Sequence, residues 1–166
     1  MPNKFYLFWI AGVVIVSLLY LLTEKLALKI FKVKADKVTF ESAKIALERL
    51  SSWTTWLTGL QTAAIGAMAL LVKGRKVQLT AVQTKYAFFV LLFYGTSIIL
   101  STWLLSSIPS AQMRLNNSGS PDEQNDIYRM KIFSFIPFTI GRFSGIVHTY
   151  FLIGVIFFAL FIFSLF

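Results

Sequence analysis

Four long apolar segments, each free of charged side chains, divide the chain into predicted helices. They cover about residues 5–23, 50–72, 86–107 and 143–166. A membrane-spanning helix needs about 20 consecutive apolar residues, whereas a surface helix of a soluble domain carries charged positions on its outer face. The pattern therefore predicts an all-α, polytopic membrane protein with four transmembrane helices, forming a single membrane domain over residues 1–166.

Polar segments separate the predicted spans at residues 24–49, 73–85 and 108–142. The first contains apolar residues at helical spacing, and its end, ESAKIALERL, is rich in helix-forming residues. We therefore expect an amphipathic helix between spans 1 and 2 that continues into the second span. In the third segment, NNSGSPD is typical of a turn or mobile loop, and Pro109 is expected to end the third span.

Composition and charge agree with a membrane location. Apolar residues make up 57% of the chain and charged residues 14%, against about 25% charged in an ordinary soluble domain. The formal net charge is +9, but basic residues of membrane proteins mainly set orientation and attract anionic headgroups, so we expect no nucleic-acid partner. Most Lys and Arg residues lie in segments 24–49 and 108–142, which predicts that these two loops are cytoplasmic.

The second predicted span differs from the others because small and polar residues replace most of its Leu and Phe. Small residues allow two helices to approach closely, and Thr and Gln side chains hydrogen-bond across such a contact. The alternative is that the same face lines a polar pore in an oligomer. The residues of this predicted packing or pore face are Thr55, Thr58, Gly59, Gln61, Thr62, Ala63, Gly66 and Ala67.

Further candidate residues lie at the membrane surfaces and in the fourth span. His148 is the only histidine in the chain, and two interpretations stay open: a pH-sensitive group, or a side chain hydrogen-bonded to a neighbouring helix. Basic side chains next to a span extend to lipid headgroups or contact a soluble partner. The residues assigned to that role are Lys25, Lys29, Lys32, Lys34, Lys37 and Arg142.

The sequence contains no recognisable motif for catalysis or cofactor binding. All Asp and Glu residues lie in the polar segments, so the spans lack the intramembrane carboxylate that is common in ion-coupled transporters. The chain has no cysteine, no phosphate-binding loop and no serine with an evident base. We therefore expect no enzymatic activity, catalytic residue, metal or cofactor, and a small transporter is a less favoured alternative.

The stretch from Ala46 to Leu71, ALERLSSWTTWLTGLQTAAIGAMALL, resembles the helix-into-span pattern of small bacterial membrane effectors of the SLATT type. The resemblance implies a bacterial inner-membrane protein in a defence or signalling assembly; a membrane subunit of another anti-phage system is equally compatible. Two hypotheses follow. The first is a non-enzymatic, homo-oligomeric membrane module, with or without a pore, that docks a soluble partner through basic loop 24–49. The second is a non-conducting scaffold or assembly subunit.

Overall fold

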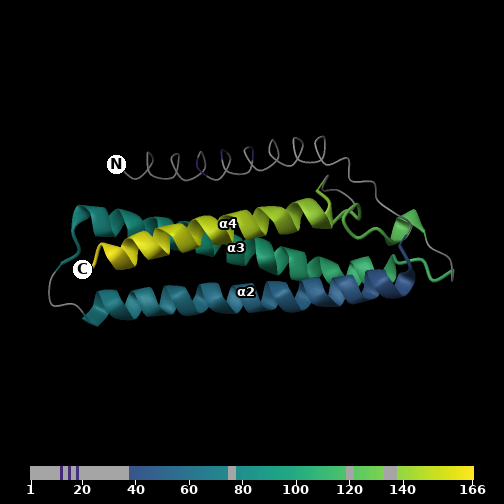
Figure 1. Ribbon diagram of the computed structural model, residues 1–166, viewed down its shortest axis with the longest axis horizontal. Helices are drawn as coiled ribbons and strands as arrows, with labels where there is room; N and C mark the ends of the chain where they lie inside the picture. The colour runs from purple at the N-terminus through teal and green to yellow at the C-terminus, as the bar shows by residue number, and fades with distance from the viewer. Residues whose placement is uncertain are drawn as a thin grey trace.

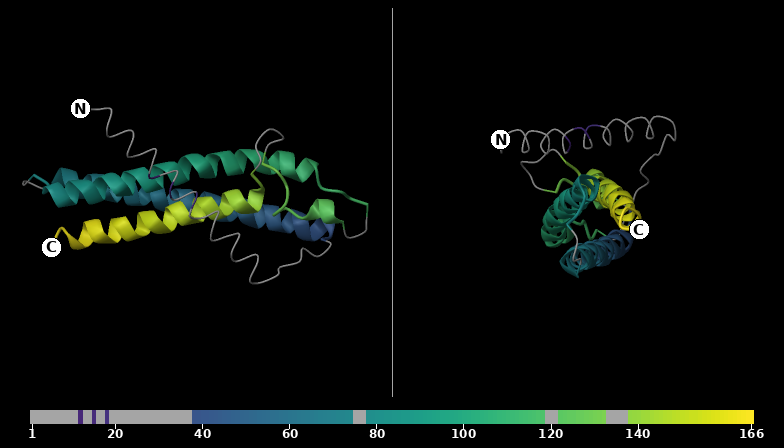
Figure 2. Two further views of the ribbon diagram at one scale, coloured as in Figure 1. Left: turned by 90° about the horizontal axis from the view of Figure 1, so that it is seen from above. Right: turned by 90° about the vertical axis from the view of Figure 1, so that its left-hand side faces the viewer.

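Three long helices form the architecture of the described part of the chain in a computed structural model. They are α2 (Phe40–Gly74), α3 (Ala81–Met113) and α4 (Ile140–Phe163), and the short 3-10 helix η1 (Glu123–Asn125) lies between α3 and α4. The three long helices lie side by side along one axis (Figure 1), and they form a triangle when viewed along that axis (Figure 2). The described ranges contain no strand, although two isolated β-bridges join loop segments. The structure describes residues 38–74, 78–118, 122–132 and 138–166, together with Gly12, Ile15 and Leu18.

Each of the three long helices is long and apolar enough to cross a membrane. The prediction of an all-α integral membrane protein is therefore confirmed for the described part of the chain. The predicted first span, residues 5–23, lies outside the described residues except for Gly12, Ile15 and Leu18, which are helical. A total of four spans accordingly stays a prediction.

α2 begins at Phe40, well before the predicted second span at residue 50. Thr39 caps its start, because the Thr39 hydroxyl accepts a hydrogen bond from the backbone N–H of Ser42 at 3.2 Å. At 1.5 Å per residue, the 35 residues of α2 extend about 52 Å, which exceeds the roughly 30 Å hydrocarbon core of a bilayer. The helix expected between spans 1 and 2 does continue into the second span, and its residues 24–37 lie outside the described residues.

α3 is longer than the predicted span 86–107 at both ends. Its start at Ala81 is fixed by a capping box, in which the Thr80 hydroxyl accepts from Gln83 N–H and the Gln83 side chain accepts from Thr80 N–H. The prediction that Pro109 ends this helix is wrong, since α3 continues to Met113. Pro109 lies on the exposed side, while Ala111 two residues later, on the opposite side of the helix, is fully buried. The packing of that side offsets the backbone hydrogen bond that proline removes.

The side of α2 that faces the bundle is set by large residues spaced three, four or seven positions apart. Such spacing keeps one side of a helix against its neighbour, as in a coiled coil. α3 packs most extensively on α4, less on α2, and α2 touches α4 at few points. The buried residues of α2 within the predicted span are Thr54, Leu57, Gln61 and Met68. Leu47, which precedes the predicted span, is buried on the same side of the helix.

Aromatic rings fill much of the contact between α3 and α4. The ring of Phe157 on α4 stacks on Phe89 and on Phe93 of α3, with centroid distances of 4.8 and 5.6 Å. At the same interface Gly154 of α4 lies directly against the buried ring of Tyr94. The two helices therefore approach closely only because position 154 carries no side chain.

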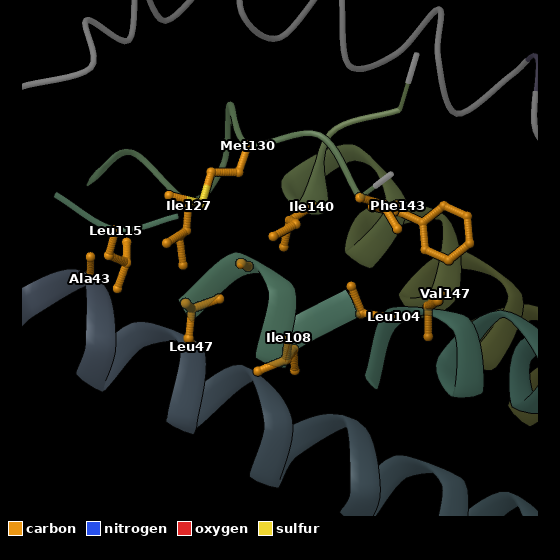
Figure 3. Packing of buried hydrophobic residues seen from close by; sticks show 12 residues of the cluster. Ala43, Leu47, Leu104, Ile108, Leu115, Ile127, Met130, Ile140, Phe143 and Val147 are labelled. Atoms are coloured by element: carbon orange, nitrogen blue, oxygen red, sulfur yellow. The ribbon is translucent and has the colours of Figure 1, made fainter. Parts of the chain in front are cut away.

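The chain between α3 and α4 forms a packed layer over one end of the bundle. We call residues 114–118 and 122–132 the cap. Ile127 and Met130 of the cap are buried against Leu47 of α2 and Ile108 of α3 (Figure 3). The apolar side chains of the cap therefore bury the ends of two helices. The turn or mobile loop expected at NNSGSPD stays a prediction, since residues 119–121 at its centre lie outside the described residues.

Asn125 joins the cap to the segment that leads into α2. Its side chain is fully buried; Oδ1 accepts from the N–H of Asn116 at 2.8 Å, and Nδ2 donates to the carbonyls of Asn116 (3.1 Å) and Val38 (3.2 Å). A β-bridge between Val38 and Asp122 lies beside it. The described parts of segments 24–49 and 108–142 thus meet at the same end of the bundle, and their location on the cytoplasmic side of a membrane stays a prediction.

Replacing Asn125 by Ala is expected to lower the stability of the cap. The variant leaves the N–H and the carbonyl of Asn116 without the Asn125 side chain as their partner, at a cost of about 1–3 kcal/mol. Hydrogen exchange of the Asn116 amide should accelerate, and thermal unfolding of the detergent-solubilised protein should begin at lower temperature. Asn117→Ala, an exposed position in the same loop, is the matched control and should leave both readouts unchanged; equal effects of the two variants would contradict this role of Asn125.

Gly154→Ala is expected to destabilise the contact between α3 and α4. A Cβ at position 154 would overlap the Tyr94 ring, and overpacking of this kind costs about 1–3 kcal/mol. The matched control is Gly95→Ala on α3, where a Cβ meets no atom within 4 Å. Unfolding of the purified protein by a denaturing detergent should shift for Gly154→Ala alone, and a similar response of both variants would argue against a close approach at Gly154.

Candidate functional site

The small residues predicted as a packing or pore face lie mainly on the outside of the bundle. At 3.6 residues per turn, Gly59 and Gly66 point in nearly the same direction, on the opposite side of α2 from the buried Leu57 and Met68. The face is therefore free of contacts with α3 and α4 in this single chain. We call the exposed residues the small face: Thr55, Gly59, Thr62, Ala63, Gly66 and Ala67.

Threonine hydroxyls at the small face and beside it bond within α2 itself. The Thr62 hydroxyl donates to the carbonyl of Thr58 at 2.9 Å, and the hydroxyl of the half-buried Thr58 donates to the carbonyl of Thr54 at 2.9 Å. A hydroxyl that is satisfied in this way needs no partner from outside the helix. These threonines therefore tolerate contact with lipid or with another helix.

Gln61 does not belong to the small face, contrary to its predicted place there, because it lies on the buried side of α2. Its Nε2 donates to Ser97 Oγ of α3 at 2.6 Å, and Ser97 Oγ donates to the carbonyl of Val147 on α4 at 3.1 Å. One buried chain of hydrogen bonds thus links all three helices. Gln61 Oε1 and Ser101 Oγ are buried polar atoms with no hydrogen-bond partner among the described residues.

His148 connects α4 to α2 near the cap. The indole N–H of Trp53 donates to His148 Nε2, and His148 Nδ1 lies 2.7 Å from the carbonyl of Ser144. A neutral imidazole with its proton on Nδ1 satisfies both contacts. The predicted hydrogen bond to a neighbouring helix is confirmed, whereas pH sensitivity stays a prediction.

A cavity of about 320 Å³ lies directly beside this pair, between α2, the cap and the start of α4. Its walls are mostly apolar, and Arg49 is the one charged residue among the described residues that line it. Arg49 and Trp53 are one helical turn apart on α2, a spacing that places both on one side of the helix. The lining residues are Ala46, Arg49, Leu50, Trp53, Ile127, Tyr128, Ile140, Gly141 and Ser144.

The basic residues predicted to contact headgroups or a partner divide into two groups. Arg142 lies in the first turn of α4, is half-buried, and its backbone N–H donates to the cap residue of that helix, Thr139. α4 therefore begins at Ile140, before the predicted boundary at residue 143. The other residues of the group lie outside the described residues: Lys25, Lys29, Lys32, Lys34 and Lys37.

Sequence reasoning missed Arg49, Trp53 and Asn125 as parts of a site. The Arg49–Trp53 spacing is visible in the sequence, but their pairing with His148 and the cap depends on helix packing.

Within the described ranges, no group of three His, Asp or Glu residues is placed to hold a metal ion. Comparisons with protein-family models, curated proteins and solved structures gave no match for this chain.

The hydrogen bond between Gln61 and Ser97 predicts an asymmetric response to mutation. Ser97→Ala leaves the buried amide of Gln61 without a partner and should cost about 1–3 kcal/mol. The double variant Gln61→Leu/Ser97→Ala removes the amide as well and should be more stable than Ser97→Ala alone. Unfolding by a denaturing detergent measures the stability of both variants. Ser106→Ala, which changes an exposed serine on α3, is the control. A double variant less stable than Ser97→Ala would contradict the buried link.

Proposed function

We propose that the protein is a non-enzymatic integral membrane module that self-associates through the small face of α2. The observation that carries the proposal is the exposure of this face on the side of α2 away from α3 and α4. Helices in lipid associate through close backbone approach and van der Waals packing, because lipid tails are as apolar as the side chains. Small residues at such positions favour contact with another helix.

The partner that fits the small face is α2 of a second copy. Copies inserted with the same orientation meet around an axis along the membrane normal, so identical faces contact each other in a two-fold dimer. Gly59 and Ala63 are four residues apart, the spacing of small-xxx-small contacts between parallel helices. Because both lie in the charge-free part of α2, the contact would form inside the membrane.

The hydrogen bonding of the threonines supports a packed contact over a water-filled pore. Thr58 and Thr62 donate to carbonyls of their own helix, and the large exposed neighbours Trp56, Leu60 and Leu70 are apolar or aromatic. A pore wall would instead offer polar groups to water. We therefore favour a non-conducting scaffold, and a pore is the competing version that the experiment below addresses.

The cellular setting and the soluble partner are also part of the proposal. Most Lys and Arg residues lie in segments 24–49 and 108–142. Under the positive-inside rule, this supports a cytoplasmic location for the end of the bundle that carries the cap. A soluble partner of complementary negative charge would contact this end. The resemblance of Ala46–Leu71 to bacterial effectors supports the inner membrane and a defence or signalling assembly.

Leucine at the small face is expected to weaken self-association. Thr62→Leu and Gly66→Leu place bulk where two backbones must approach, and we expect a loss of about tenfold or more in dimer affinity, equivalent to about 1.4 kcal/mol. Single-molecule photobleaching in liposomes over a range of protein densities measures the dimer fraction. Thr102→Leu is the matched control, because Thr102 is an exposed α3 threonine that also donates to its own helix. Gln61→Leu, on the buried side of α2, should leave the dimer fraction unchanged.

The same preparations distinguish a scaffold from a pore. Planar-bilayer recording should show no conductance for the unmodified protein, and a conductance abolished by Thr62→Leu would replace the scaffold by a pore built on the small face. A monomer at every protein density would contradict self-association itself.

A further inference from the structure

The cavity between α2, the cap and α4 lies at the depth where the chain enters the membrane. Arg49 is the last charged residue before the charge-free segment 50–72, and Leu50 and Trp53 continue the cavity wall along α2. Tryptophan and arginine are typical of the headgroup level, with apolar side chains below. One end of the cavity is therefore near phosphate groups and the other near acyl chains.

The charges around the cavity favour an anionic ligand. Arg49 is exposed, and the described residues give it no ion pair. None of the described residues that line the cavity is acidic. A guanidinium binds a phosphate through two parallel hydrogen bonds, and basic pockets between transmembrane helices suit anionic lipid headgroups.

Packing around the cavity holds its walls in place. Trp53 is fixed by the hydrogen bond to His148 and by stacking on Trp56, with ring centroids 5.0 Å apart. Gly141 lies against Tyr128, and a Cβ at position 141 would overlap the Tyr128 ring. The site is thus preformed, which reduces the entropy lost when a flexible ligand is ordered.

We propose that this cavity binds an anionic phospholipid, with Arg49 contacting the headgroup phosphate and part of one acyl chain lying on Trp53. The volume of about 320 Å³ is at the small end of ligand pockets, which suits one part of a lipid whose remainder stays in the bilayer. The site lies on a different side of α2 from the small face, so it is independent of self-association.

Fluorescence quenching of Trp53 by brominated lipids tests the proposal. In the full chain, Trp9→Phe, Trp56→Phe and Trp103→Phe leave Trp53 as the reporter and keep an aromatic ring at position 56. The protein is reconstituted in phosphatidylcholine vesicles that contain, in equal small proportion, either brominated phosphatidylglycerol or brominated phosphatidylcholine. We expect the anionic lipid to associate about fivefold more strongly, the effect of one basic residue near the membrane surface.

Two variants and one competitor separate this site from general surface attraction. Arg49→Gln should remove the preference, whereas Lys44→Gln, which removes a charge at the same end of α2 outside the cavity, should keep it. Ala46→Leu fills the cavity and should reduce quenching by both lipids. Added inorganic phosphate should have no effect. Equal quenching by both lipids, a preference that survives Arg49→Gln, or a preference removed by inorganic phosphate would overturn the proposal.

Discussion

The three long helices have unequal lengths, and the structure of the end of the bundle that carries the cap follows from that difference. α3 has 33 residues and α4 has 24, so α2 and α3 extend past the start of α4 at the end where Val38 meets Asp122. Leu47 and Ile108 near this end are apolar, and α4 alone does not cover them. The cap covers them with Ile127 and Met130, and Asn125 satisfies the backbone groups that this cover would otherwise leave buried and unpaired.

The sequence was sufficient to predict the three long described helices, but not which side of each helix packs inside the bundle. Runs of apolar residues identify α2, α3 and α4 because the bilayer imposes a minimum length. The start of α3 at Ala81 was not predicted, although Thr80 and Gln83 carry a capping pattern in the sequence. The continuation of α3 past Pro109 and the packing of the cap could not be predicted from the sequence, because both depend on apolar partners that are distant in the chain. Residues 24–37, with most of the predicted basic contact residues, lie outside the described ranges.

The two sides of α2 show why the candidate site was only partly predictable. Small residues favour close helix contacts both within a chain and between chains, so their presence does not say which contact they form. The side that packs inside is decided by Leu57 and Met68, whose bulk fits against α3, and by Gln61, whose amide reaches Ser97. Because α2 packs mainly on α3, it touches α4 at few points, one of which is the hydrogen bond from Trp53 to His148. The cavity lies beside that contact.

The cap also sets an order of events during synthesis. Leu47 leaves the ribosome about 80 residues before Ile127, which at roughly 5–20 residues per second is an interval of roughly 4–16 s. Throughout that interval the projecting end of α2 has no apolar cover from the cap. A nascent chain stopped before the cap therefore has an apolar end of α2 that lacks the cover supplied by Ile127 and Met130.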